Sequence, residues 1–295
     1  MFSRKIKFLV LLFVSLGFVV VWSFRPQQKY YLSVCAIFRN EARFLPEWIE
    51  YHKLHGVEHF YLLNNLSEDD YQSALKPYID DGLVELYQWP YHGKNQREWN
   101  TIQCSAYKKL LRDKKRETFW MAIIDTDEFL VPVQTDDLKN FLKPYEPYGG
   151  VTINWQLFGT SNVEKIPQGK SLIGALTHRA PSDHPRNLFV KSIVQPRKVR
   201  KIAEPHYCHY IKPHYHVTEN FERMPSVSLS TKVSIDKIRL HHYTNRDELF
   251  LRTEKLKRFK EWNPNETIVY PSYNDVEDTT LQAQAPLVEK QLTVR

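Results

Sequence analysis

The sequence predicts an α/β domain in which a parallel sheet carries helices on both faces. In the first half of the chain, short apolar runs alternate with longer amphipathic stretches, and this pattern is typical of β-α-β units. The 295 residues are 42% hydrophobic and 14% aromatic, so the chain can build a large core. One continuous α/β domain therefore fits the sequence better than two small domains.

Seven elements follow one another in the first half. The run YLSVCAIF at 31–38 has the composition of a buried strand, and the amphipathic stretch after it ends at Gly56, a residue common where helices end. Ser67 and Asp70 suit the start of the next helix, because such side chains form capping boxes. The expected strands are 31–38, 59–64, 83–89 and 119–131, and the expected helices are 43–56, 67–82 and 96–113.

The second half has more loops, and these are rich in proline and histidine. Strand-like segments occur at 150–156, 188–195 and 234–240, and a helix is expected at 246–262. From Asn263 the chain is polar, so we expect a loosely ordered tail over 263–295. The folded domain is accordingly placed at 31–262.

An uncharged apolar stretch at 8–24 follows Arg4, Lys5 and Lys7. About 17 helical residues span roughly 25 Å, close to the lower limit for crossing a membrane. Basic residues before such a stretch favour a cytoplasmic N-terminus, although those just after it leave the opposite orientation open. The expected order is a cytoplasmic N-terminus at 1–7, a type II signal anchor at 8–24 and a short stem at 25–30. A single-pass membrane protein of the Golgi, or of a bacterial inner membrane, is therefore expected.

Three carboxylates interrupt the apolar run FWMAIIDTDEFLV at 119–131. Ligands of parallel sheets bind beyond the carboxyl ends of the strands, so Asp125 and Asp127 are expected at a ligand site. Side chains alternate along a strand, so these two can point the same way and bind Mg²⁺ or Mn²⁺. Glu128 would then lie on the opposite face and orient a neighbour. The alternative is that all three are turn and capping residues.

Five blocks of the sequence resemble glycosyltransferase family 92. The most specific are VCAIFRNEARFLPEWIEYHKLHGVEHFYLLNNLS at 34–67 and WMAIIDTDEFLVP at 120–132. The later blocks are INWQLFGTSN at 153–162, VKSIVQP at 190–196 and LHHYTNRDELFLRTEKLKRF at 240–259. The resemblance covers roughly 33–262, and it is poor over 169–185.

The resemblance implies a GT-A type, Rossmann-like fold with a mixed, mostly parallel sheet and flanking helices, preceded by one transmembrane helix. Characterised members of the family are inverting, metal-dependent transferases that use a UDP-sugar, chiefly UDP-galactose, to extend glycans. The implied cofactor is Mn²⁺ or Mg²⁺. The implied partners are a nucleotide sugar and a glycan acceptor on protein, lipid or polysaccharide.

The resemblance also implies positions for the site. The implied metal ligands are Asp125, Asp127 and His242, with His241 as the less favoured histidine. The residues implied near the nucleotide, at the end of the first strand, are Arg39, Asn40 and Glu41.

Other roles are assigned from residue type alone. Lys191 and Arg197 are candidates for stabilising phosphate charge, although each also fits a surface position. Trp155 suits stacking on a sugar, but a core position suits it better. Inversion in one step needs a general base for the acceptor hydroxyl, and Asp183 and Glu164 are the candidates.

The net charge of +7 suits an anionic partner such as a nucleotide. Nucleic acid is not expected, because the sequence contains no recognised nucleic-acid module. The basic stretch 252–260 fits a solvated helix face as well as a ligand site. The segment 206–216 holds four histidines and one cysteine, but its spacing matches no standard zinc motif. The main rival hypothesis is a non-catalytic, sugar- or nucleotide-binding membrane protein of the same fold.

Overall fold

The computed structural model describes residues 28–135, 137–262 and 271–294. The membrane anchor expected at 8–24 lies outside these described residues. Across the ranges just given, no helix is long and apolar enough to cross a membrane.

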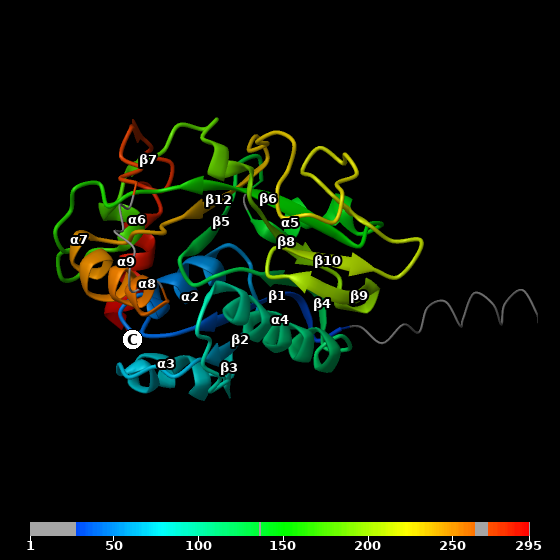
Figure 1. Ribbon diagram of the computed structural model, residues 1–295, viewed down its shortest axis with the longest axis horizontal. Coiled ribbons are helices and arrows are strands. Elements are labelled where there is room, and N and C mark those ends of the chain that lie inside the picture. Colours follow the sequence, from blue (N-terminus) through cyan, green and yellow to red (C-terminus); the bar gives the residue numbers. More distant parts are fainter. Residues whose placement is uncertain (1–27, 136, 263–270, 295) are drawn as a thin grey trace, which may run out of the picture.

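Strands from both halves of the chain form one central sheet (Figure 1). Its members are β1 (Tyr30–Phe38), β2 (His59–Asn64), β3 (Val84–Gln88), β4 (Thr118–Ile123), β5 (Glu128–Pro132), β6 (Gly150–Leu157), β8 (Val190–Val194), β11 (His216–Val217) and β12 (Ile238–His242). Their order is β3-β2-β1-β4-β8-β6-β12-β5, and β11 pairs with β6. Strands β3, β2, β1 and β4 are parallel, whereas β8 and β5 are antiparallel to their neighbours. The sheet is therefore mixed and mostly parallel.

Helices flank this sheet. They are α2 (Leu45–Leu54), α3 (Tyr71–Asp80), α4 (Gln96–Asp113), α5 (Leu138–Leu142), α6 (Leu172–Ala175), α7 (Glu248–Phe250), α8 (Leu256–Trp262) and α9 (Ala285–Val294). A π-helical turn, Leu251–Lys255, joins α7 to α8, and short 3₁₀ turns lie at Lys143–Tyr145, Pro185–Leu188 and Pro196–Lys198. Two small ribbons complete the fold: β9 (Val199–Glu204) with β10 (Tyr207–Tyr210), and β7 (His178–Arg179) with β13 (Val276–Glu277).

Alternating side chains of β1 build a core on each face of the sheet. Val34 and Ala36 belong to the cluster that contains the apolar residues of α2 and α3. Cys35 and Ile37 belong to the cluster on the other face, which contains those of α4 and part of the β9–β10 ribbon. This period of two, on a strand buried on both faces, is what a strand between two helical layers requires.

The predicted start of α3 needs a correction. Asp70 caps this helix alone, because its side chain accepts the Ser73 N–H at 3.3 Å. The Ser67 hydroxyl instead accepts the Asn40 N–H at 3.0 Å and ties the end of β1 to the loop after β2. The pair therefore does not form the capping box that the sequence suggests.

The single strand expected at 119–131 is wrong, because the structure has two strands there. Strand β4 pairs with β1 and β8, while β5 pairs with β12 at the far edge of the sheet. The residues between them form a turn, in which the Glu128 N–H donates to the Asp125 carbonyl at 3.1 Å and the Asp125 N–H donates to Glu128 Oε2 at 2.8 Å. Asp125 and Asp127 therefore lie in a turn and not along a strand.

The described part of the C-terminal region is folded, which differs from the loose tail expected there. Helix α9 packs against α2 and α6, and Leu281, Ala285 and Val288 are buried. The apolar residues of this region are widely spaced among polar ones, and this spacing hides the buried face from a sequence-based prediction.

Buried Glu47 of α2 makes stability depend on pH. Its two carboxylate oxygens accept the N–H groups of Leu172, at 2.7 Å, and Ile173, at 3.0 Å. Burial nevertheless raises its pKa from 4.5 to about 7. A raised pKa stabilises the fold below the unfolded value, and this contribution is lost as the pH rises through about 7.

We therefore expect the parent to lose about 3 kcal/mol of unfolding free energy between pH 4.5 and 8, relative to Glu47→Gln. Urea unfolding of both proteins across this range measures the difference. If the difference in unfolding free energy between the two proteins stays constant with pH, the Glu47 carboxyl has an ordinary pKa in the folded protein.

Candidate functional site

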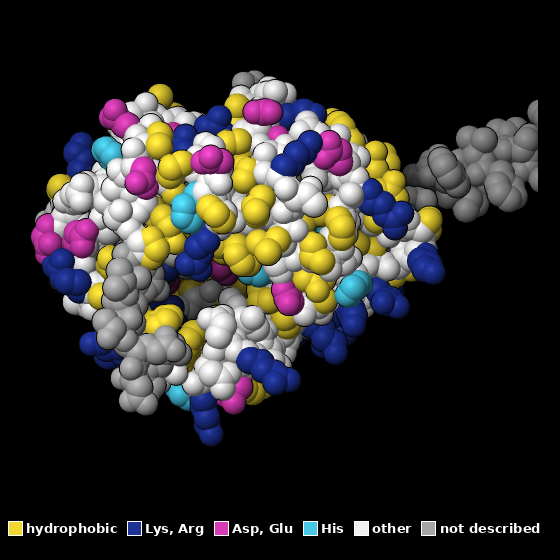
Figure 2. All heavy atoms as spheres, turned by 45° about the horizontal axis from the view of Figure 1, so that its top comes forward, with side chains coloured by type: hydrophobic (Ala, Val, Ile, Leu, Met, Phe, Trp, Pro, Cys, Tyr) yellow, Lys and Arg dark blue, Asp and Glu magenta, His cyan; other side chains and the backbone are white. Residues whose placement is uncertain are grey.

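The candidate site lies where the strand order of the sheet reverses. Strands β2 and β3 continue from one side of β1, and the chain then returns to place β4 on its other side. In open α/β sheets such a switch point forms a crevice beyond the carboxyl ends of the strands. A pocket of about 330 Å³ lies here, and Figure 2 shows a hollow with basic and acidic side chains at its rim.

The pocket collects charged and aromatic side chains from five parts of the chain: the end of β1, the first turns of α4, the β4–β5 turn, the 3₁₀ turn before β8, and the segment from β12 to α8. Its polar lining residues are Arg39, Glu41, Gln96, Gln103, Asp125, Thr126, Asp127, Arg186, His242, Thr244, Lys255 and Arg258. The apolar ones are Ile37, Phe38, Trp99, Phe259 and Trp262.

Asp127 is buried at the centre of this arrangement. Its Oδ2 accepts a hydrogen bond from Lys255 Nζ at 3.0 Å, and its Oδ1 lies 3.4 Å from His242 Nε2. The antiparallel pairing of β12 with β5 positions this histidine, because His242 stands opposite Glu128. The neighbouring His241 faces away and packs against Phe158, with ring centroids 4.6 Å apart.

The charges of this group follow from its surroundings. Burial alone raises the pKa of Asp127, but Lys255 and His242 outweigh it and hold that pKa well below the usual value. Burial lowers the pKa of His242, and Asp127 offsets this only in part. At neutral pH the site therefore presents a charged carboxylate beside a neutral imidazole, whose ring nitrogen can bind a cation.

Asp125 belongs to a second, deeper group. Its Oδ2 accepts from Lys191 Nζ at 2.8 Å, and this lysine is 1% exposed and lies 3.7 Å from Glu128 Oε2. Burial opposes the charge on Lys191, but Asp125 and Glu128 outweigh it and raise the lysine pKa. Lys191 is thus a buried counter-ion and does not line the pocket, which corrects its assignment to the phosphate.

Glu128 orients its neighbours, as the sequence suggests, but it shares Lys191 with Asp125 and so does not lie on the opposite face from it. It is fully buried, and its Oε1 accepts from Trp155 Nε1 at 2.6 Å while Oε2 accepts the Asp125 N–H. Burial raises its pKa well above the ordinary value, and the charges of Asp125 and Asp127 add to this against Lys191. Trp155 is consequently a core residue and not a platform for a sugar.

Arg246 is not among the residues predicted from the sequence, although it holds the turn between β4 and β5 in place. It is fully buried, donates to Glu41 Oε2 at 2.5 Å and to the Thr126 carbonyl at 3.0 Å, and lies over the Phe44 ring at 4.4 Å. Glu41, which was expected near the nucleotide, therefore lines the pocket while paired with an arginine. No sequence pattern separates Arg246 from the exposed basic residues that follow it.

The other residues expected near the nucleotide divide into two groups. Arg39 lines the pocket. Asn40, with a φ of 55°, does not line it and instead holds the loop after β2, where its Oδ1 accepts the Glu68 N–H at 2.8 Å.

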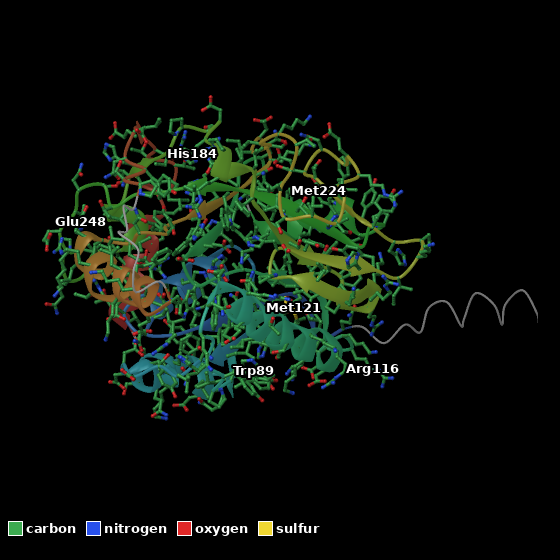
Figure 3. The ribbon with its side chains drawn as sticks, viewed as in Figure 1. Trp89, Arg116, Met121, His184, Met224 and Glu248 are labelled. Carbon is green, nitrogen blue, oxygen red and sulfur yellow. The ribbon has the colours of Figure 1, made fainter. Side chains whose placement is uncertain are left out.

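Arg197 lies at the wrong end of the sheet. Because β8 runs antiparallel to β4, the residues after β8 lie beside the beginning of β4. Arg197 Nε donates there to the Lys115 carbonyl at 2.9 Å. Figure 3 shows Arg116, the next residue, far from Glu248 at the start of α7. The assignment of Arg197 to phosphate binding is therefore wrong.

Neither candidate base lines the pocket. Glu164 is exposed and pairs with Arg252 on the surface. Asp183 is exposed in the turn before the 3₁₀ turn Pro185–Leu188, which carries the pocket residue Arg186.

Lys255 and Arg258 line the pocket, although the sequence gives no specific indication that either residue is functional. Both come from the basic stretch 252–260, which fits a solvated helix face equally well. The structure turns these two toward the pocket, whereas Lys257 and Lys260 are exposed and do not line it. Trp99 and Trp262, with ring centroids 6.3 Å apart, add an aromatic wall.

The donor set fits a divalent cation in part. Among the described residues, no three Asp, Glu, His or Cys side chains meet closely enough to hold a metal ion, and this includes 206–216. Two donors do meet, Asp127 Oδ1 and His242 Nε2, and Asp125 Oδ1 is buried nearby with no hydrogen-bond partner in the described part of the chain. Mg²⁺ needs one or two carboxylates when phosphate and water supply the rest. Asp127 and His242, supported by Asp125, therefore suit such an ion.

A mixed α/β sheet with an acidic turn at its switch point defines a class of ligand-binding α/β domains. Within this class the chain belongs to glycosyltransferase family 92, whose model matches residues 28–285.

Curated relatives of the same family come from plants. A family 92 protein of Ricinus communis is 26% identical over 203 residues, covering 67% of this chain and 33% of the relative. One of Oryza sativa subsp. japonica is 31% identical over 171 residues, covering 56% and 27%. The chain thus spans about a third of the length of these relatives, or less.

Solved structures show weaker likeness. S. aureus TarS 1-349 is 12% identical with a TM-score of 0.39, covering 89% of this chain and 70% of that one. Glucosyl-3-phosphoglycerate synthase from Mycobacterium tuberculosis, in complex with Mn²⁺, UDP and glucosyl-3-phosphoglycerate, is 16% identical with a TM-score of 0.29, covering 46% and 47%. These scores describe a distant similarity of shape, and nothing about the reaction follows from them.

Proposed function

We propose that this protein is an inverting glycosyltransferase that moves a sugar from a UDP-sugar to a glycan acceptor with the help of Mn²⁺ or Mg²⁺. One observation carries the proposal: a charged, buried carboxylate and a neutral imidazole meet 3.4 Å apart in a pocket at the switch point of the sheet. In the same pocket Arg39, Arg186 and Arg258 offer positive charge to a diphosphate.

Asp127 and His242 would hold the cation, and Asp125 would complete its surroundings. Bound there, a divalent cation would offset the charge that develops on the leaving diphosphate. Trp99 and Trp262 offer apolar rings to the base or the sugar. Of the two candidate bases, Asp183 keeps the better position, because it lies three residues before Arg186 and is free of the ion pair that holds Glu164.

The donor sugar and the setting are also proposals. The family resemblance favours UDP-galactose, and the acceptor is a glycan on protein, lipid or polysaccharide. The apolar stretch 8–24 would anchor the enzyme in a membrane by a single pass. A rival function, binding without turnover, is favoured by the two lysines that neutralise Asp125 and Asp127.

A screen of sugar nucleotides tests this proposal. The full chain in detergent with Mn²⁺ and a mixture of glycan acceptors is given UDP-galactose, UDP-glucose or UDP-N-acetylglucosamine, and the UDP released on transfer of the sugar is measured. We expect release from UDP-galactose to be about tenfold faster than from the others, because hydroxyl-reading sites discriminate at least this strongly. Faster release from another sugar nucleotide would refute galactose. No release from any, with UDP binding intact, would favour the non-catalytic alternative.

A further inference from the structure

The segment 251–262, formed by the π-helical turn and α8, contributes Lys255, Arg258, Phe259 and Trp262 to the lining of the pocket. None of its residues is buried. Two of its polar contacts reach pocket-lining residues: Lys255 to Asp127, and Arg258 to the Arg39 carbonyl at 3.3 Å. Others lie outside the lining: Glu254 to Asn40 at 3.3 Å, Trp262 to the Gly93 carbonyl at 3.1 Å, and Arg252 to Glu164 and Glu248 on the surface. A segment held in this way can shift without disturbing the core.

Lys255 is the last residue of the π-helical turn. Such turns are rare, and they occur frequently at functional sites. Its side chain is 18% exposed and lines the pocket, and its Nζ lies 3.0 Å from Asp127 Oδ2 and 3.5 Å from Thr244 Oγ1. This ammonium group therefore reaches both a carboxylate and the space where an anionic ligand would lie.

The two lysines that pair with Asp125 and Asp127 in the turn between β4 and β5 differ in their freedom to move. Lys191 is 1% exposed and lies within reach of two carboxylates, so Asp125 keeps a permanent counter-ion. Among the described residues, Lys255 forms an ion pair with one carboxylate, Asp127, and it stands on a segment with no buried residue. Asp127 thus has a counter-ion that can leave it.

We propose that Lys255 is a donor-binding residue that exchanges partners: it neutralises Asp127 before the donor binds, and it contacts the donor diphosphate once a divalent cation is bound at Asp127 and His242. This inference rests on the proposed function. An ammonium group and a divalent cation repel each other at one carboxylate, and a diphosphate attracts both. The exchange keeps the pocket close to charge balance in either state, which a buried site requires.

The exchange predicts opposite effects on two affinities. Lys255 competes with the cation for Asp127, so removing its charge strengthens cation binding in the absence of nucleotide. Lys255 also attracts the diphosphate, so the same change weakens nucleotide binding. A residue that merely supports the fold would weaken both affinities or neither.

Calorimetry on the full chain in detergent tests this with three variants. Mn²⁺ is titrated into the parent, Lys255→Met, Lys255→Arg and Lys257→Met, and UDP is then titrated into each at saturating Mn²⁺. For Lys255→Met we expect Mn²⁺ to bind about tenfold more tightly and UDP about tenfold more weakly, since a charge-assisted hydrogen bond is worth roughly one such factor. Lys255→Arg keeps the charge and should bind UDP nearly as the parent does.

Lys257→Met is the matched control, because Lys257 lies two residues further on in α8, is exposed and does not line the pocket. We expect both of its affinities to equal those of the parent. If Lys255→Met shifts the two affinities in the same direction, or shifts neither, the partner exchange is refuted while the proposed function stands. If the parent binds neither Mn²⁺ nor UDP, the proposed function fails, and the inference fails with it.

Discussion

Replacing Asp127 with asparagine is expected to slow the release of UDP from the sugar nucleotide by roughly a thousandfold, equivalent to about 4 kcal/mol. The change keeps the shape of the side chain and the backbone bond from the Tyr243 N–H to the Asp127 carbonyl. It removes the negative charge that faces His242 and Lys255. Steady-state rates of UDP release at saturating Mn²⁺ measure the effect.

Asp236→Asn is the control for this substitution, because Asp236 is exposed and lies outside the pocket lining. Its rate should equal that of the parent. Asp125→Asn should fall between the two, since Asp125 is already neutralised by Lys191 at 2.8 Å. If Asp127→Asn keeps more than about a tenth of the parent rate, Asp127 does not hold the cation, because removing a charge-stabilising contact costs at least 10²-fold.

Replacing Lys191 with methionine is expected to cost at least about 3 kcal/mol of unfolding free energy, because it strands carboxylates in a buried site. Asp125 loses its partner at 2.8 Å, and fully buried Glu128 loses the ammonium at 3.7 Å. Urea unfolding at pH 8 measures the loss.

The pH dependence of this loss identifies its cause. The pKa of Glu128 is already raised by burial, and it rises further once Lys191 is gone. Protonation of Glu128 then removes its unpaired charge in the variant, so the difference in unfolding free energy between variant and parent should shrink from pH 8 to pH 5. Lys232→Met, which removes an exposed ion pair with Glu222, is the control and should cost no more than about 1 kcal/mol. A Lys191→Met variant as stable as the parent at pH 8 would show that this group is not an essential counter-ion.

Regular elements were predictable where local signals agreed. The predicted helix 96–113 has the bounds of α4, because the Asn95 side chain caps it by accepting the Glu98 N–H at 3.0 Å. The predicted strand 59–64 has the bounds of β2, which is entirely buried and has four apolar residues between His59 and Asn64. The break between β4 and β5 was not predictable in the same way. Apolar residues flank it on both sides, and only pairing with β12 takes β5 to the far edge of the sheet.

Part of the site was also visible in the sequence. Asp125 and Asp127 follow a strand, and pairing of β12 with β5 brings His242 to Asp127. Lys191 shows the limit of such reasoning. Its residue type suggests a phosphate ligand or a surface position, but the side chain is 1% exposed and pairs with Asp125, so it is a buried counter-ion. Lys255 and Arg258 are the opposite case, because they line the pocket although the sequence does not distinguish them from surface residues. Their side chains face the pocket because of the π-helical turn, which no local sequence pattern predicts.

The first measurement to make is a calorimetric titration of UDP into the full chain in detergent, with Mn²⁺ and with a chelator, for the parent and for the double variant Asp125→Asn with Asp127→Asn. The proposed donor site predicts that the parent binds UDP in the presence of Mn²⁺, that the chelator abolishes this binding, and that the double variant does not bind. A folded parent that ignores UDP under both conditions would contradict the assignment of the pocket to a UDP-sugar.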